Sequence, residues 1–241
     1  MTAKTRFSQF FQGIHDGISI CLGYFSVAFA FGIFAVSNGL TPLETIQISA
    51  ANVTSAGQLA AVPVMLSGGT LIELALSQFI INLRYSLMSI SLSQKLDSSV
   101  KLLHRFIIAF VNTDEVFAVA SAKESVGKQY VFGLILTPYV GWTAGTAVGA
   151  FAGNVMPAIV ITALGIAIYG MFIAIVVPPA RADRHILFCV CLSVVLSCLF
   201  RFVPFLDKVQ TGFVVIICSV LAAAITAVLF PAEEMKENNA V

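Results

Sequence analysis

The strongest constraint on the fold is that apolar segments long enough to cross a bilayer follow one another along almost the whole chain. Eight such segments can be drawn, at residues 18–37, 45–66, 71–94, 105–121, 130–152, 157–178, 185–204 and 211–230. A transmembrane helix needs about 20 mostly apolar residues, so a chain of 241 residues has room for seven or eight spans and little else. We therefore predict an all-α, polytopic membrane protein with about seven transmembrane helices, within a range of six to eight.

Composition agrees with this class. Apolar residues are 59% of the chain and charged residues only 10%, against about 25% charged residues in a soluble domain. The net charge of +1 argues against nucleic acid as a partner and leaves the lipid bilayer. Connections are short and carry turn signals at 38–39, 68–69 and 178–179. We predict one transmembrane domain over 1–231, with a first helix that is retained rather than cleaved, and a polar tail at 232–241.

Two of the eight segments are poor spans. Segment 45–66 has a polar stretch at 52–58 followed by Pro63, and segment 105–121 has four consecutive polar residues at 112–115. Four consecutive side chains point in four directions around a helix and cannot share one polar face. Either both are ordinary buried helices with shielded polar groups, or one or both are broken or re-entrant. An irregular backbone at membrane depth is tolerated only inside protein or beside a cavity.

The distribution of Lys and Arg bears on the same question. Basic residues gather at the N-terminus, at 95–105 and at 181–185. If all eight segments span from a cytoplasmic N-terminus, the last two of these regions fall outside, against the positive-inside rule. All three lie inside if neither 45–66 nor 105–121 spans the membrane. The span count stays open at this stage.

A weak internal repeat is visible at an offset of 115 residues. It aligns three residues with their counterparts, namely Tyr24 with Tyr139, Pro42 with Pro157 and Pro63 with Pro178. Secondary transporters are often built from such repeats, with discontinuous helices forming a site near the membrane midplane. Whether this repeat is inverted depends on the span count.

Arg84 lies in the middle of segment 71–94. A guanidinium near the bilayer centre costs about 2.5–3.5 kcal/mol, so it must face a cavity, pair with a carboxylate or bind a ligand. The helical period places two polar stripes on opposite faces, one with Gln78, Asn82, Tyr85 and Ser89 and the other with Glu73, Arg84 and Ser91. Either Arg84 neutralises Asp114 or Glu115 and holds helices together, or it contacts a charged substrate.

Residues 141–153 carry a glycine at every fourth position: Gly141, Gly145, Gly149 and Gly153. Small residues at this spacing let two helices approach closely, as in GxxxG interfaces. We predict a packing face, whose partner helix belongs either to this chain or to another.

Catalytic patterns are missing from the sequence. It has no phosphate-binding loop, no nucleophile elbow and no zinc-protease motif. The five cysteines all lie in apolar segments and are interpreted as core residues. We predict no enzyme activity, no cofactor and no metal.

Several short motifs resemble the AzlC/YgaZ-type family. They are G-I-H-D-G-I-S-I-C-L-G-Y-F at 13–25, F-A-F-G at 29–32, T-S-A-G-Q at 54–58, I-N-L-R-Y at 81–85, N-T-D-E at 112–115 and the glycine ladder. They occur in the family's order over about residues 10–205. The resemblance implies the large subunit of a branched-chain amino acid exporter in the bacterial cytoplasmic (inner) membrane. It also implies a small, roughly four-span AzlD/YgaH-type membrane subunit as partner.

The chain departs from the family pattern at four serine or tyrosine positions. Ser55 stands where glycine is expected, Tyr85 where histidine is usual, and Ser19 and Ser26 where proline is common. Two of these departures fall in motifs expected at the site, so the cargo need not be leucine, isoleucine or valine.

These observations predict a subunit of a secondary active transporter that exports branched-chain or similar apolar amino acids, coupled to protons. The predicted substrate-binding residues are Arg84, Asn82, Gln58, Ser55, Gly57 and Tyr85, and the predicted proton-coupling or charge-pairing residues are Asp114 and Glu115. Arg84, or N–H groups at a break near 55–58, would hold the substrate carboxylate. Asp114 or Glu115 would hold its ammonium group. The alternative is a channel-like or scaffold subunit without its own transport activity.

Overall fold

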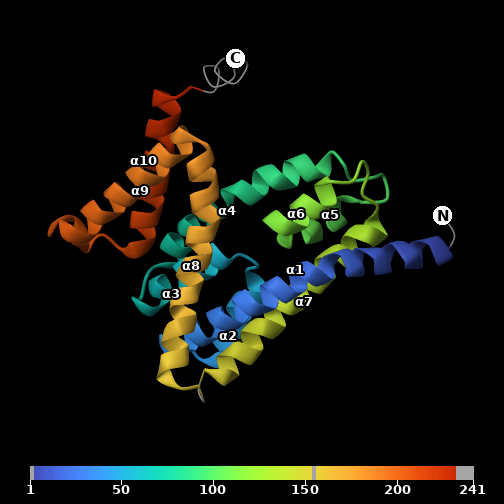
Figure 1. Ribbon diagram of the computed structural model, residues 1–241, viewed down its shortest axis with the longest axis horizontal. Coiled ribbons are helices and arrows are strands. Elements are labelled where there is room, and N and C mark those ends of the chain that lie inside the picture. Colours follow the sequence, from blue (N-terminus) through green and yellow to red (C-terminus); the bar gives the residue numbers. More distant parts are fainter. Residues whose placement is uncertain (1–2, 154–155, 232–241) are drawn as a thin grey trace. The chain divides into compact units, whose positions relative to one another are not determined.

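Every regular element in the described part of the chain is a helix, which confirms the all-α prediction. The computed structural model describes residues 3–153 and 156–231, and the predicted tail at 232–241 lies outside this range. The elements are α1 (Ala3–Ser37), α2 (Pro42–Ala51), α3 (Ser55–Leu66), α4 (Leu71–Ser93), α5 (Leu102–Phe110), α6 (Asp114–Ser121), α7 (Lys128–Ala152), α8 (Ala158–Ala182), α9 (Arg184–Phe202), the 3-10 turn η1 (Leu206–Lys208) and α10 (Thr211–Leu229), labelled in Figure 1.

The chain divides into two compact units. Unit 1 comprises Met1–Leu59 and Ile81–Ile168, and unit 2 comprises Ala60–Ile80 and Tyr169–Val241. Helices α3, α4 and α8 therefore each contribute to both units. In unit 2, the start of α9 lies beside the end of α10, since the rings of His185 and Phe230 are 4.5 Å apart. These two helices form an antiparallel hairpin.

Four helices in the described ranges are long and apolar enough to cross a membrane. They are Phe7–Ser37, Lys128–Ala152, Arg184–Phe202 and Thr211–Leu229. Helix α1 begins at Ala3, well before the predicted residue 18, because a helix can continue beyond its most apolar stretch through polar positions such as Gln9 and Gln12.

The predicted turns are right at two positions and wrong at a third. Gly39 and Gly68 adopt φ values of +110° and +71°, which favour glycine, and each ends a helix. Pro178 and Pro179, however, lie inside α8 rather than at its end. Proline is tolerated within membrane helices because neighbouring groups and local adjustments satisfy the carbonyls that it frees.

Both poor spans are broken. The first separates into α2 and α3 with a break at 52–54, and the second into α5 and α6 with a break at 111–113. The interpretation as two continuous helices is therefore wrong. Thr113 takes an extended conformation at the start of α6, with φ −84° and ψ 173°. The clustered polar side chains favour this break because a continuous helix would have turned some of them towards apolar surroundings.

Helices α5 and α6 leave and return at the same end of unit 1. The segments that flank them are joined by two hydrogen bonds, from the Asp97 N–H to the Val126 carbonyl (3.1 Å) and from the Val126 N–H to the Lys95 carbonyl (2.8 Å). The backbone N–H of Lys128, the first residue of α7, also donates to the Ser99 hydroxyl at this end, at 3.1 Å. The pair α5–α6 thus forms a helical hairpin whose two ends lie together.

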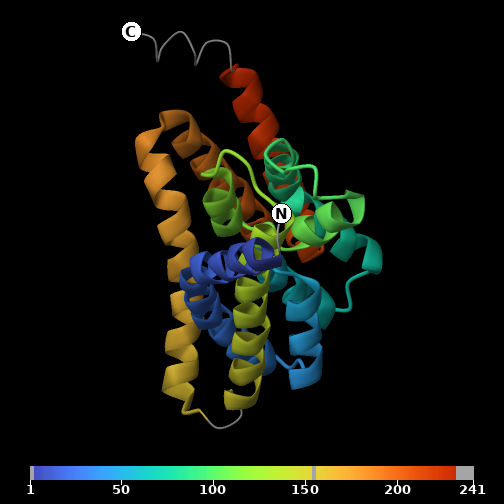
Figure 2. The same cartoon turned by 90° about the vertical axis from the view of Figure 1, so that its right-hand side faces the viewer.

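Helices α1 and α7 lie side by side in both views, coloured blue and yellow (Figures 1 and 2). A Cβ atom on Gly13 would meet the backbone at Tyr130, near the start of α7, and one on Gly32 would meet Thr146, near its end. The contacts therefore advance in the same direction along both helices, so α1 and α7 are parallel. An inverted repeat would have placed Tyr24 and Tyr139 on antiparallel helices, so the offset of 115 does not describe one.

The glycine ladder contacts α1 of the same chain. A Cβ on Gly141 would lie 2.6 Å from the Cys21 carbonyl oxygen, and those on Gly145 and Gly149 would collide with the backbone at Phe25 and Phe29. Three of the four glycines are therefore required by close helix approach. Gly153 differs, because the nearest atom of α1 would be Ile33 Cα at an ordinary 3.5 Å.

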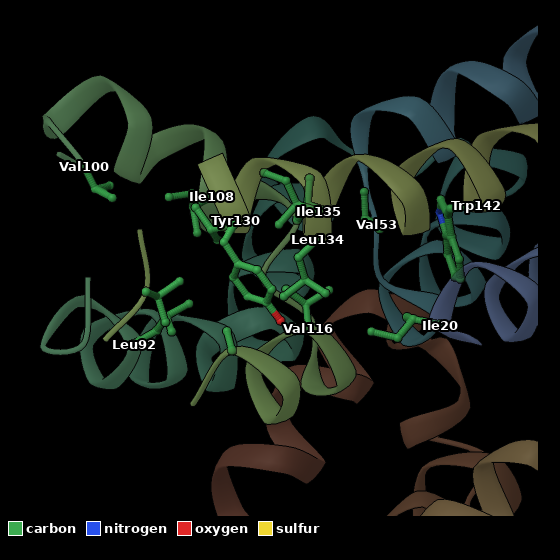
Figure 3. Packing of buried hydrophobic residues seen from close by; sticks show 14 of the residues in the cluster. Ile20, Val53, Leu92, Val100, Ile108, Val116, Tyr130, Leu134, Ile135 and Trp142 are labelled. Atoms are coloured by element: carbon green, nitrogen blue, oxygen red, sulfur yellow. The ribbon is translucent and has the colours of Figure 1, made fainter. Parts of the chain in front are cut away.

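A cluster of buried apolar side chains lies beside this interface. Figure 3 shows Trp142 of α7 near Ile20 of α1 and near Val53 of the first break, with Val116 of α6 and Leu134 of α7 further along. The cluster joins both broken helices to α1 and α7. The breaks are therefore held in fixed positions by packed protein.

Candidate functional site

The two helix breaks border one cavity in unit 1. Its volume is about 160 Å³, and it is lined by Ala51, Asn52, Val53 and Thr54 at the first break, by Ala109, Phe110, Asn112 and Thr113 at the second, and by Asn82 and Tyr85 of α4. A cavity of roughly 150 Å³ can hold a benzene molecule. The space therefore suits part of a small metabolite rather than a large ligand.

The first break lies halfway along α7. The Tyr139 hydroxyl donates to the Ala50 carbonyl (3.1 Å), and the Trp142 indole N–H donates to the Asn52 carbonyl (3.3 Å). Tyr139 and Trp142 occupy the middle of Lys128–Ala152. The carbonyls at the end of α2, which have no partner within the helix, are thus satisfied by aromatic donors of α7.

Gln58 holds the two sides of the first break together through hydrogen bonds. Its side chain is fully buried, and its Nε2 donates to the Ser49 hydroxyl (2.6 Å) and to the Asn52 carbonyl (3.0 Å). The Ser49 hydroxyl is in turn 2.5 Å from that of Thr146 on α7. Gln58 was predicted to bind substrate, but it does not line the cavity; it spans the break and joins α2 to α3.

Ser55 and Gly57 lie in the first turn of α3, directly after the cavity-lining residue Thr54. Their side-chain positions do not line the cavity. What this turn offers is the N-terminal end of a helix, with a partial positive charge and no acidic side chain in its first turn.

Arg84 lies beside the cavity rather than within its wall. Its Nη2 is 2.9 Å from Asp114 Oδ2 and donates to the Tyr85 hydroxyl at 3.1 Å, while the guanidinium stands 5.0 Å from the centre of the Tyr85 ring. The side chains of Arg84 and Asp114 are 54% and 46% exposed, so the described residues of this chain do not enclose the pair.

Asp114 and Glu115 are adjacent but have different partners. Asp114 pairs with Arg84, whereas Glu115 Oε2 accepts a hydrogen bond from the Tyr24 hydroxyl of α1 at 2.5 Å. Both carboxylates lie in the first turn of α6, where the helix dipole favours negative charge. The second break therefore presents a negative helix start, and the first break a positive one.

Four polar residues of the cavity wall were missed as site residues: Asn52, Thr54, Asn112 and Thr113. All four belong to the polar stretches that marked the poor spans, and that signal could have identified them. Asn112 is 2% exposed, and its Nδ2 donates to the Ser89 hydroxyl at 3.1 Å.

Asn112 and Ala109 also line a second cavity of about 240 Å³. Most of its wall is apolar, including Ile90, Leu92, Leu96, Leu102, Phe106 and Ile108, and Ser89, Ser93 and Arg105 complete it. A polar and an apolar cavity thus adjoin at Asn112.

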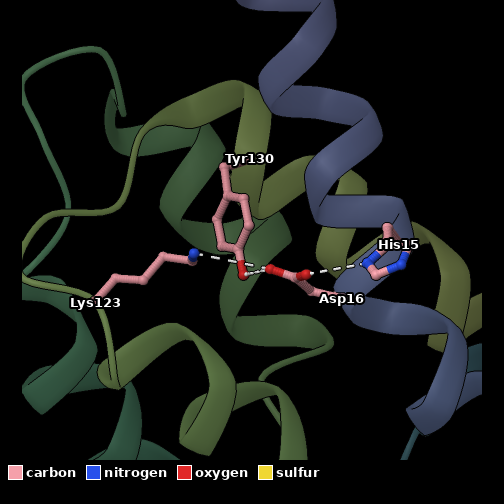
Figure 4. Close-up of polar contacts among 4 residues, drawn as sticks. All are labelled: His15, Asp16, Lys123 and Tyr130. Atoms are coloured by element: carbon pink, nitrogen blue, oxygen red, sulfur yellow. Dashed lines mark hydrogen bonds and ion pairs between the residues drawn. The ribbon is translucent and has the colours of Figure 1, made fainter.

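A polar cluster joins the segment after the α5–α6 hairpin to α1 and α7 (Figure 4). Asp16 Oδ2 accepts a hydrogen bond from the Tyr130 hydroxyl at 2.7 Å and lies 3.8 Å from Lys123 Nζ, which follows α6. His15 Nδ1 is 3.4 Å from the other carboxylate oxygen. These contacts lie away from the breaks and tie the hairpin's return segment to the parallel pair.

Comparison of the sequence with known proteins identifies a family. The family model described as AzlC protein matches residues 19–156, which include both breaks, Arg84 and the glycine ladder. The inner membrane protein YgaZ of Escherichia coli (strain K12) is 30% identical over 152 residues, covering 61% of this chain and 62% of that protein. An uncharacterized membrane protein of Archaeoglobus fulgidus is 31% identical over 188 residues, covering 77% of this chain and 82% of that protein.

The chain thus spans less than two thirds of the length of the Escherichia coli relative. No solved structure matches the chain. The family match and the two membrane-protein relatives confirm the resemblance found in the motifs and the assignment to a membrane. The chain belongs to the AzlC family of membrane proteins.

Proposed function

We propose that this protein is the large subunit of a secondary active transporter that exports apolar amino acids across the bacterial inner membrane. The observation that carries the proposal is the polar cavity between two helix breaks, one of them halfway along α7. Discontinuous helices of transporters use their exposed helix ends and freed carbonyls to bind charged substrate groups.

The charges around the cavity are complementary to a zwitterion. The first turn of α3, starting at Ser55, offers a positive helix end, and Arg84, which pairs with Asp114, contacts Tyr85 of the cavity wall. These groups suit the substrate carboxylate. Asp114 and Glu115 lie on the opposite break and suit the ammonium group.

The apolar cavity next to Asn112 suits the substrate side chain. The polar cavity alone is too small for a complete branched-chain amino acid with its hydration, whereas the two together offer a polar and an apolar compartment. In this arrangement Asn112 touches the substrate where its α-carbon meets its side chain. An apolar amino acid fits both compartments, and a charged one does not.

The small AzlD/YgaH-type subunit is part of this proposal. None of the described side chains of α9 is buried within this chain, and apolar residues such as Phe202 and Val194 are widely exposed. Either a partner helix or lipid can cover such a surface. The test below therefore compares the chain with and without the small subunit.

The test is transport by the full-length chain in lipid vesicles, with and without the small subunit. An imposed pH gradient should drive accumulation of radiolabelled leucine against its concentration gradient. Thr54→Val, which removes a polar group from the cavity wall, should reduce uptake, while Ser91→Ala on the outer face of α4 should not. Equilibration without accumulation would favour the channel-like alternative, and no leucine movement under any condition would refute the proposal.

A further inference from the structure

Glu73 is the one fully buried carboxylate among the described residues. It belongs to unit 2, in the first turn of α4, and its side chain is 0% exposed. Its Oε1 accepts a hydrogen bond from the backbone N–H of Gly212, at the start of α10, at 2.8 Å. An ionisable side chain buried within a membrane protein is by default a candidate functional site.

The carboxylate is enclosed by backbone. A Cβ atom on Gly212 would lie 2.5 Å from Glu73 Cγ, and one on Gly69 would lie 2.8 Å from Glu73 Oε2. No side chain other than hydrogen fits at either position while Glu73 keeps its place. The two glycines therefore make room for the Glu73 side chain to reach from α4 to α10.

Comparison with the start of α2 shows that helix capping alone does not explain the burial of Glu73. Thr41 and Glu44 form the same T-x-x-E motif as Thr70 and Glu73. At the start of α2, the Thr41 N–H donates to Glu44 Oε2 at 2.8 Å, and the capping box forms in an exposed position. At the start of α4, Thr70 Oγ1 accepts from the Glu73 N–H at 3.1 Å, but the Glu73 carboxylate bonds Gly212 instead of the Thr70 N–H.

No positive charge compensates Glu73. Residues 67–70 and α10, which contact it, contain no Asp, Glu, Lys, Arg or His, and the next charge along α4 is Arg84. The turn before α10 carries Asp207, which pairs with Arg201 at 3.5 Å. Across residues 3–153 and 156–231, no ion pair reaches Glu73, and its Oε2 accepts no hydrogen bond.

The two carboxylate oxygens of Glu73 therefore differ in their surroundings. Oε1 is held by the Gly212 N–H, whereas Oε2 is buried with no hydrogen-bond partner among the described residues. A buried polar atom without a partner calls for an explanation, and a proton bound at Oε2 would supply one.

We propose that Glu73 is a proton-binding site of the membrane domain and, resting on the proposed function, that it carries the coupling proton. Oε2 takes up one proton and becomes a neutral hydroxyl, while Oε1 keeps its bond to Gly212. Release of the proton on the other side of the membrane restores the carboxylate. One proton is bound and one released in each cycle.

Infrared difference spectroscopy tests whether Glu73 binds a proton, and it requires no transport measurement. Spectra of the full-length chain in lipid vesicles are recorded from mildly acidic to mildly alkaline pH, and the Glu73→Gln spectrum is subtracted from the wild type. We expect the carbonyl band of a protonated carboxylic acid, which fades as the pH rises. The exposed Glu44→Gln serves as the matched control and should give no such band.

If Glu73→Gln fails to fold, Glu73→Asp replaces it, since the acid band of aspartate should shift in frequency rather than disappear. Absence of a protonated-acid band over the whole range would show that Glu73 is a permanently ionised helix cap and would overturn the proposal.

Flux measurements test whether the proton bound by Glu73 is the coupling proton. Glu73→Gln should lose pH-driven leucine accumulation while keeping leucine exchange, and Glu44→Gln should keep both. Accumulation that persists in Glu73→Gln overturns the coupling role. A wild-type chain that moves no leucine refutes the proposed function instead, and the infrared assignment then stands by itself.

Discussion

Gly149→Ala tests the close packing of α1 against α7. The added Cβ would meet backbone atoms of Phe29, with Phe29 C at 2.9 Å and Phe29 Cα at 3.0 Å. Backbone atoms cannot rotate away as a side chain can, so the two helices must separate along part of their interface. Gly23→Ala on α1 is the matched control, because its Cβ would have no neighbour within 4 Å.

The expected magnitude combines two effects. Replacing glycine by alanine inside a helix gains up to about 1 kcal/mol of stability from helix propensity at either position. Overpacking costs about 1–3 kcal/mol, and a collision with backbone belongs at the upper end of this range. Gly149→Ala should therefore lose about 2 kcal/mol net, and the two variants should differ by about 3 kcal/mol, or roughly 6–12 °C in Tm.

Trp142 provides the assay. It is the single tryptophan of the chain, it is 2% exposed, and its ring packs edge-on against Tyr24 of α1 at 5.3 Å. Separation of α1 from α7 should therefore change its fluorescence during thermal unfolding in detergent. If Gly149→Ala unfolds at the same temperature as Gly23→Ala, the helices are not in close contact there and the argument fails.

Three further predictions concern the site, each measured as flux in vesicles and as folded protein in membranes. Arg84→Lys should fold and insert but lose most export, because a single ammonium cannot replace a planar guanidinium that contacts a carboxylate and a tyrosine together; normal export would contradict this. Asp114→Asn, which leaves Arg84 without its carboxylate, should lower leucine exchange, whereas Glu115→Gln, whose amide can still bond the Tyr24 hydroxyl, should retain more of it; unchanged flux in both would exclude a role for either. Ser93→Leu, which fills the apolar cavity, should reduce leucine transport more than alanine transport, whereas Ser91→Leu on the outer face should leave that ratio unchanged.

The sequence predicted the helical class and, for a local reason, identified the two segments in which a break was one of the alternatives. Four consecutive polar residues at 112–115 cannot share a helix face, and this requires no knowledge of distant residues. It also predicted that Arg84 faces a cavity, pairs with a carboxylate or binds a ligand, since an unpaired charge in an apolar segment is costly. It could not choose between Asp114 and Glu115, because that choice depends on where α1 places Tyr24, which takes Glu115.

Other features depended on contacts between distant parts of the chain. Gln58 looked like a ligand residue but bonds Ser49 and the Asn52 carbonyl, because the break frees this carbonyl within reach of a side chain in the first turn of α3. Glu73 looked like one member of a polar stripe, yet a partner 139 positions away encloses it. Periodicity reports which side of its own helix a residue occupies, whereas burial depends on which other helix packs there. The sequence by itself therefore determined the helices, their breaks and their charges, and the tertiary structure decided which charges are paired, which are enclosed and which border the cavity.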